Sequence, residues 1–179
     1  MIVSKTIKYV PGLYKIFDEI LVNARDQSVK DRTCRKIKID IDQQTGRITC
    51  WNNGENGMPV EFHNVDKCYV PELLFFKIRT SENYEEKDKV VGGKNGIGAK
   101  AANIFSVNFD VTVVDNKNKK MYQQSFSNNM YEKSEPKITN ITKKCESSLE
   151  ISFIPDYKRF GVDGLSDDVV GAAIKTGEN

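Results

Sequence analysis

Four glycines and two lysines stand close together in the stretch Val91-Gly-Gly-Lys-Asn-Gly-Ile-Gly-Ala-Lys100, between a charged loop and an apolar run. Glycines let the backbone adopt positive φ angles and come close to a ligand. If the apolar run over residues 99–105 is a helix, its first amides point at whatever anion lies there. Lys94 and Lys100 add positive charge to those amides. The stretch therefore predicts a phosphate-binding loop that leads into a helix.

Two common nucleotide-binding motifs do not fit this stretch. A P-loop needs a lysine and then a hydroxyl residue directly after its last glycine, but here Lys100 comes one place late and an alanine follows it. A dinucleotide fingerprint needs G-x-G-x-x-G directly after a strand, whereas Gly96 and Gly98 are preceded by a polar loop and followed by Ala101. The alternative is a flexible surface loop, so the stretch has to be weighed together with the rest of the chain.

Composition limits the class of protein. The 179 residues suit one sizeable domain over residues 1–179. A net charge of +2 with spread-out lysines does not by itself argue for binding to nucleic acid or membrane. The four cysteines lack C-x-x-C spacing and there is a single histidine, so free thiols are expected rather than a zinc site. With no long apolar stretch and no signal peptide at its start, the chain is expected to be soluble and intracellular, with no membrane partner.

Apolar periodicity predicts the order of the elements. Apolar residues recur at helical spacing over residues 11–27, which predicts an amphipathic helix. Alternation over residues 37–41 and 48–51, on either side of a turn at 43–46, predicts a β-hairpin. The other expected elements are short helices over 71–78 and 99–105, strands over 109–114, 121–126, 137–141 and 149–154, and a last helix from near residue 166. Helices interspersed with hairpin-linked strands predict an α/β (α+β) two-layer sandwich with a mixed, mostly antiparallel sheet and helices on one face, not a Rossmann domain.

Three polar residues share one stripe of the first predicted helix. Glu19, Asn23 and Asp26 follow the pattern E-x-x-x-N-x-x-D, which places them together where the apolar face meets solvent. Glu19 could accept a proton from an attacking water, and Asn23 could offer a neutral oxygen to a Mg²⁺ that holds phosphate oxygens. Asp26 could orient a water or a lysine. A solvated helix face is the alternative for such a pattern taken alone.

A second segment, Trp51-Asn-Asn-Gly-Glu-Asn-Gly-Met-Pro59, follows the predicted hairpin. Asn52 carries both a donor and an acceptor and could bind the edge of a purine, while the glycines leave space for the base. The N-N-G sequence is also ordinary for a turn, so this segment too gains its meaning from the others.

The order of these three segments closely resembles the ATP-binding motifs of the GHKL, or Bergerat, ATPases. That family includes type IIA DNA topoisomerases, Hsp90, MutL and sensor histidine kinases. Within it the chain resembles eukaryotic-type DNA topoisomerase II, through VPGLYKIFDEILVNA at 10–24, YVPE at 69–72, TSENY at 80–84 and FIPD at 153–156. The resemblance covers nearly the whole chain and implies a GHKL fold with ATP and Mg²⁺ as cofactors.

The resemblance also assigns roles to residues. It implies that Glu19 activates the hydrolytic water, that Asn23 coordinates Mg²⁺ and that Asn52 contacts adenine. Ser81 and Asn83 would face the ribose and phosphates. The remaining nucleotide-binding residues would be Asp26, Gly93, Lys94, Asn95, Gly96, Ile97, Gly98, Ala99 and Lys100.

The chain departs from the family pattern at several positions. Glu82 and Lys30 replace a typical serine and a typical arginine, and the loop 52–59 is one residue longer than usual. The late-strand hydroxyl of the family has two candidates here, Ser148 and Ser152. Such departures suggest a divergent member, for example one from a large DNA virus. The loop over 79–98 could act as a lid.

The resemblance implies the ATP-binding domain of a larger type II topoisomerase, without its transducer lysine segment and DNA cleavage core. The full-length enzyme would dimerise on binding ATP and pass one DNA duplex through another, in the nucleus for a cellular eukaryote or in host cytoplasm or nucleus for a virus. Two alternatives stay open: another GHKL ATPase, such as a MutL-like repair ATPase or a kinase, and a nucleotide-binding module with little turnover.

Overall fold

The computed structural model describes residues 10–77, 97–143, 145–168 and 170–171. The elements in these ranges are α1 Pro11–Lys30, β1 Ile37–Asp42, β2 Arg47–Asn53, β3 Phe62–His63, β4 Cys68–Tyr69, α2 Val70–Phe75, α3 Gly98–Ile104, β5 Ser106–Asp115, β6 Lys120–Ser127, β7 Glu132–Lys133, β8 Lys137–Asn140, β9 Ser148–Pro155 and the 3₁₀ helix η2 Tyr157–Phe160. Among these described helices, none is long and apolar enough to span a bilayer.

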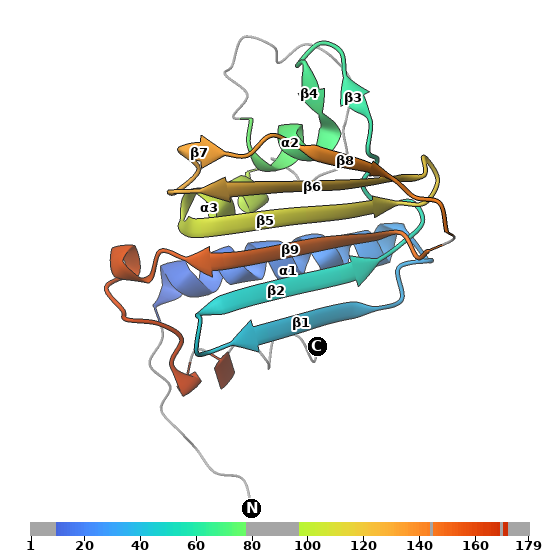
Figure 1. Cartoon of the computed structure of the whole chain (residues 1–179). Helices are drawn as coiled ribbons and strands as arrows, with labels where there is room; N and C mark the ends of the chain where they lie inside the picture. The colour runs from blue at the N-terminus through green and yellow to red at the C-terminus, as the bar shows by residue number, and fades with distance from the viewer. Residues whose placement is uncertain (1–9, 78–96, 144, 169, 172–179) are drawn as a thin grey trace, which may run out of the picture.

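The main sheet has the strand order β1-β2-β9-β5-β6-β7, with β8 also paired to β6. Every pairing between the described strands is antiparallel. Figure 1 shows the helices gathered behind the sheet, with α1 behind β9 and β2 and α3 behind β5 and β6. The predicted two-layer sandwich with helices on one face is confirmed.

The core lies between α1 and the inner face of the sheet. The buried residues of α1 recur at helical spacing and form one stripe: Leu13, Ile16, Phe17, Ile20, Leu21 and Ala24. They meet alternate residues of the strands, which point to the same face of the sheet: Ile48, Cys50, Phe109, Val111, Val113, Ile151 and Phe153. Burial of each large apolar side chain stabilises the fold by about 1.5–3 kcal/mol. This packing fixes α1, and with it the polar stripe on the shoulder of the helix.

Helix α1 runs three residues further than the apolar periodicity predicted. Its first turn begins at Pro11, whose fixed φ suits that position, and it ends at Lys30 because Asp31 is extended. The last turn presents no apolar residue to the core, and Val29 is 77% exposed. Periodicity reports only the buried face, so it ended the predicted helix one turn early.

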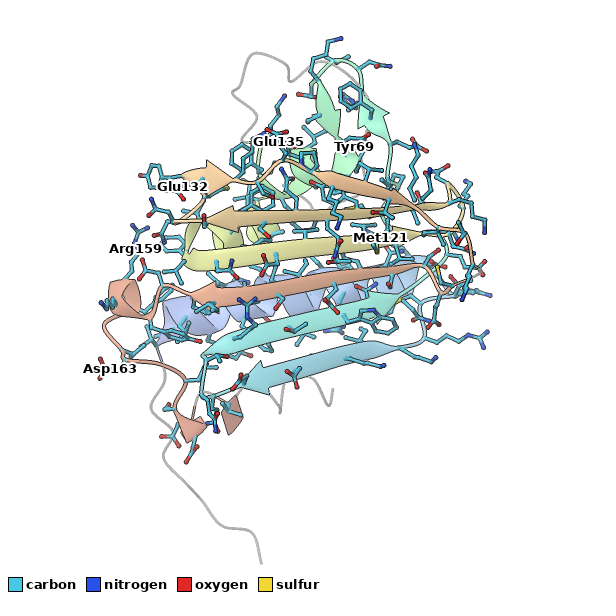
Figure 2. The ribbon with its side chains drawn as sticks, viewed as in Figure 1. Tyr69, Met121, Glu132, Glu135, Arg159 and Asp163 are labelled. Carbon is cyan, nitrogen blue, oxygen red and sulfur yellow. The ribbon has the colours of Figure 1, made fainter. Side chains whose placement is uncertain are left out.

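The hairpin β3–β4 stands apart from the main sheet and was not predicted. Its strands have two residues each, too short for an alternating pattern to be seen. Tyr69, labelled in Figure 2, joins the hairpin to the sheet, because its ring centroid lies 5.5 Å from that of Phe62 and 6.1 Å from that of Tyr122. The two-residue strand β7 was missed for the same reason, and the four-residue helix η2 was missed because it is too short to show a helical period.

The structure agrees with the predictions for the cysteines and for the C-terminal segment. Cys34, Cys50 and Cys68 are buried, Cys145 is exposed, and all four are free thiols. Residues 167, 168, 170 and 171 are helical, at the place where a last helix was predicted.

Candidate functional site

A cavity of about 1120 Å³ lies between α1, the loop after β2, α2 and the start of α3. The predicted site residues that line it are Glu19, Asn23, Asp26, Asn52, Ile97, Gly98 and Ala99. They come from three segments far apart in the sequence, so the fold brings the three motifs to one place. Lys100 follows on α3 but is not among the lining residues.

Six predicted site residues lie outside the described residues: Ser81, Asn83, Gly93, Lys94, Asn95 and Gly96. The same holds for Glu82 and for the loop expected to act as a lid, except its last two residues.

The carboxylate of Glu19 lies against the first residue of α3. A Cβ placed on Gly98 would be 1.8 Å from Oε2 of Glu19, so the approach requires a residue without a side chain. On its other side Glu19 forms an ion pair with Lys15, whose Nζ lies 2.8 Å from Oε1. Hydrogen bonds to Glu19 and Asp18 raise the pKa of Lys15. The carboxylate is thus held at the junction of α1 and α3, within the cavity wall.

Asn23 follows Glu19 by one helical turn, and Asp26 and Lys30 continue the stripe into the cavity wall. Asn23 offers an amide oxygen and its neighbours offer carboxylate oxygens, which are the hard ligands that Mg²⁺ prefers. The described residues contain no cluster of three or more His, Cys, Asp or Glu side chains that could hold a metal ion by themselves. A site of this kind suits an ion that takes most of its other ligands from phosphate and water.

Two adjacent asparagines at the end of β2 have different roles. Asn53 is buried, its Oδ1 accepts from the amides of Arg35 at 2.9 Å and Lys36 at 2.8 Å, and its Nδ2 donates to Glu146 at 2.6 Å. Asn53 therefore connects the end of β2 to the segments just before β1 and β9. Asn52 is also buried but lines the cavity, with its Nδ2 donating to the carbonyl of Asn53 at 3.1 Å. The strand includes both residues, so the loop begins at Gly54 rather than at Asn52 as expected.

Sequence reasoning missed Asp31, which is 4% exposed and supports the loop after β2. Burial alone would raise the pKa of its carboxyl, but hydrogen bonds from Thr33 and Asn56 outweigh burial and lower the pKa from 3.8 to about 2. The D-x-T sequence directly after a helix is typical of a carboxylate that caps its own turn, and this signal could have drawn attention to it.

The far wall of the cavity contains a second missed carboxylate, Asp115, at the end of β5. It accepts hydrogen bonds from the amide of Val60 at 2.8 Å and from Nδ2 of Asn118 at 2.8 Å. Ser148 lines this wall at the start of β9. Ser152, the other candidate hydroxyl, instead contacts Thr49 at 2.8 Å on the polar face of the sheet, because it alternates with the inward-facing Ile151 and Phe153. Of the two candidate hydroxyls, Ser148 lines the cavity and Ser152 does not.

Comparison of sequences identifies relatives over nearly the whole chain. DNA topoisomerase 2 of Acanthamoeba polyphaga mimivirus is 52% identical over 171 residues, which are 94% of this chain and 13% of the relative. DNA topoisomerase 2 of Penicillium chrysogenum is 45% identical over 165 residues, 92% of this chain and 10% of the relative. The chain therefore spans about a tenth of the length of these curated relatives. No protein-family model matches the chain.

Comparison of structures gives the same result. The ATPase region of Saccharomyces cerevisiae topoisomerase II superposes with a TM-score of 0.86 at 41% identity, over 97% of this chain and 46% of that one. The 43K ATPase domain of Thermus thermophilus gyrase B, solved with an aminocoumarin, superposes with a TM-score of 0.70 at 22% identity, over 91% of this chain and 39% of that one. The second likeness, at this identity, shows the fold alone.

Proposed function

We propose that this chain, which belongs to the DNA topoisomerase II family and has the GHKL ATPase fold, binds ATP with Mg²⁺ in the cavity between α1, the loop after β2 and α3. One observation carries the proposal: Glu19, Asn23, Asn52 and Gly98 come from three distant segments and line the same cavity. A solvated helix face and an ordinary turn would not converge in this way. The solved Saccharomyces cerevisiae relative is an ATPase region, and the proposal extends that activity to this chain.

The site divides into an adenine end and a phosphate end. Asn52 and the loop 54–59 would hold the base, because they form the cavity wall at the end of β2. The first residues of α3 would face the phosphates, with Asn23 supplying an amide oxygen to Mg²⁺. Mg²⁺, when bound, would offset the negative charge of the phosphates. Lys30 adds positive charge to the cavity wall.

Glu19 is the proposed general base. It would accept a proton from the water that attacks the terminal phosphate, since its carboxylate lies beside the first residue of α3, where the phosphates would end. The ion pair with Lys15 fixes the orientation of the carboxylate. In a chain extended to the length of its relatives, Glu19→Ala should abolish hydrolysis and leave nucleotide binding largely intact. Turnover near that of the unaltered protein would rule out this role.

The longer protein to which this domain would belong is, we infer, a type II topoisomerase that passes one DNA duplex through another. DNA would be its substrate, and two copies would associate when ATP binds. The names of the relatives support this inference over a MutL-like repair ATPase or a kinase. This chain would be a single ATP-binding domain of that protein, with little turnover of its own.

Calorimetric titration with a nonhydrolysable ATP analogue, with and without Mg²⁺, tests the proposal directly. We expect one analogue to bind per chain, more tightly when Mg²⁺ is present. The variant Asn52→Ala should weaken binding, whereas Ser152→Ala, on the other face of the sheet, should not. Absence of binding by the unaltered chain would overturn the proposal.

A further inference from the structure

We propose that Asp31 is a positioning residue, which holds the loop after β2 in the shape that binds the adenine base. The inference rests on the proposed nucleotide site and assigns a role to a residue that does not itself line the cavity. Asp31 follows the last residue of α1, and its side chain is almost completely buried. A buried carboxylate away from the reacting atoms needs a structural explanation, because burial of an unpaired charge is costly.

Three consecutive amides of the loop are held by hydrogen bonds. The amide of Gly54 donates to the carbonyl of Ser147 at 3.1 Å, that of Glu55 to Oγ1 of Thr33 at 2.7 Å, and that of Asn56 to Oδ2 of Asp31 at 2.9 Å. Two of the three acceptors belong to the segment directly after α1. The path of the loop is therefore set by that segment.

Thr33 depends on Asp31 for its own orientation. The hydroxyl of Thr33 donates its single hydrogen to Oδ1 of Asp31 at 2.7 Å, so its lone pairs are left to accept from the amide of Glu55. The amide of Thr33 also donates to Oδ1, at 2.9 Å. Removal of the Asp31 charge would thus loosen both loop contacts, the direct one to Asn56 and the indirect one to Glu55.

The loop also packs directly on the carboxylate. A Cβ on Gly54, whose φ is +148°, would lie 2.9 Å from Oδ2 of Asp31, so this position tolerates only glycine. Gln27, from the last turn of α1, donates through Nε2 to the carbonyl of Asn56 at 3.1 Å. Since Gly54, Asn56 and the residues up to Pro59 line the cavity, the carboxylate determines where the wall next to Asn52 stands.

The chain contains a matched pair that lacks this connection. In the turn between β1 and β2, Oγ1 of Thr45 donates to Oδ2 of Asp42 at 2.7 Å, and the amide of Gln44 donates to Oδ1 at 2.9 Å. Neither Asp42 nor Thr45 lines the cavity. The Asp42 and Thr45 pair therefore serves as a control with the same chemistry in another turn.

The test compares Asp31→Asn and Thr33→Val with Asp42→Asn and Thr45→Val. Each chain is titrated calorimetrically with a nonhydrolysable ATP analogue and with inorganic tripolyphosphate, both with Mg²⁺. The first two variants should bind the analogue about tenfold more weakly, because each loses a buried hydrogen bond to the loop, and should bind tripolyphosphate within about twofold of the unaltered chain. The control variants should change neither affinity. Equal losses for both ligands, or an unchanged affinity for the analogue, would overturn the inference.

Hydrogen exchange without nucleotide separates this inference from the proposed function. Asp31→Asn should speed exchange of the amides of residues 55 and 56 by about tenfold or more, while amides of β5 and β9 stay protected. Thr33→Val, which keeps the shape of the side chain, gives the same reading at residue 55 if Asp31→Asn does not fold. Unchanged exchange at both amides would overturn the role of Asp31. If Asp31→Asn speeds exchange in the loop but the unaltered chain fails to bind the analogue, the role of Asp31 in the loop would stand and the nucleotide site would be overturned.

Discussion

At the scale of single residues, the contact between Glu19 and Gly98 controls the position of the proposed base. The Gly98→Ala variant should displace the carboxylate, because the new Cβ would stand 1.8 Å from Oε2 and 2.7 Å from Cδ of Glu19. Alanine is the better helix former, so α3 itself should not be weakened. We expect turnover to fall by about a hundredfold in a chain extended to the length of its relatives, because a small displacement of a catalytic group has an effect of this size.

A matched glycine provides the control for this variant. Gly171 is helical, and among the described residues no atom outside its own helix backbone lies within 4 Å of a Cβ placed on it, so Gly171→Ala should leave turnover unchanged. Thermal unfolding of both variants checks that the fold is kept. Turnover of Gly98→Ala equal to that of Gly171→Ala would show that the close approach has no role in hydrolysis.

Asn23 tests the proposed metal site at the same scale. Its amide oxygen would bind nucleotide through Mg²⁺, so Asn23→Ala should weaken binding of an ATP analogue about tenfold or more with Mg²⁺ present and much less in excess chelator. Calorimetric titration under the two conditions measures the difference. Equal losses in both would point to a packing defect in the cavity wall.

At the scale of elements, an ion pair between a buried carboxylate and an exposed lysine joins α2 to the sheet edge. Glu72 of α2 is 4% exposed and pairs with Lys133 of β7, and its Oε2 accepts from Nε2 of Gln124 at 3.2 Å. The Lys133 Nζ also lies 5.1 Å from the centroid of the Phe76 ring. These contacts hold α2, which contributes Leu74 to the cavity wall.

Loss of the lysine should therefore destabilise the fold. Lys133→Ala leaves the Glu72 carboxylate buried without its partner, which should cost about 1–3 kcal/mol of unfolding free energy in urea denaturation. The control is Lys36→Ala, which breaks an exposed pair with Glu146 and should cost at most about 0.5 kcal/mol. The double change of Lys133→Met with Glu72→Gln should recover most of the loss. Equal effects of the two lysine variants would show that burial of the Glu72 carboxylate does not make its ion pair more important for stability than the exposed pair.

The sequence allowed the longer elements and the short elements β8, α2 and α3 to be predicted, but not the strands of two residues. The β1–β2 hairpin and the long strands β5, β6 and β9 were predicted because alternation over six or more residues exposes one face and buries the other. The β3–β4 hairpin and β7 have two residues per strand and leave no such signal. Strand order was not predictable either, because β9, last in the chain, lies between β2 and β5.

The sequence predicted the residues that form the motifs themselves. It did not predict the residues that support those motifs from other segments. Glu19, Asn23 and Asn52 were predicted as site residues because their residue types form the pattern, and the structure places all three on the wall of one cavity. Asp31 and Asp115 act on backbone amides of other segments. Such contacts depend on tertiary structure, so the sequence does not reveal the segments that these carboxylates hold, although the D-x-T sequence at 31–33 marks the turn that Asp31 caps.

At the scale of the whole molecule, the free energy of unfolding should decrease in acid as Asp31 becomes protonated. The pKa of its carboxyl is about 2 in the fold against 3.8 in the unfolded chain, so the unfolded state takes up the proton first as pH falls. The contribution of Asp31 to stability is full above pH 3.8 and is lost as pH falls through 3.8 toward 2. The neighbouring thiol of Cys34 does not contribute over this range, because a thiol is neutral in acid and burial raises the pKa of Cys34 further.

The prediction is measured as a difference between two chains. The free energy of unfolding of the unaltered chain should exceed that of Asp31→Asn by a constant amount at neutral pH, and the excess should shrink below pH 3.8. Asp42→Asn is the control, because hydrogen bonds from Thr45 lower the pKa of an exposed carboxyl in the same way but connect it to no other segment. Its excess should be smaller at every pH, because water competes with the hydrogen bonds of an exposed carboxylate and screens its charge. An Asp31 excess that stays constant down to the acid limit would mean that the carboxylate is not held by its four hydrogen bonds from Thr33 and Asn56. The shape of the loop would then depend on its contacts with Ser147 and Gln27.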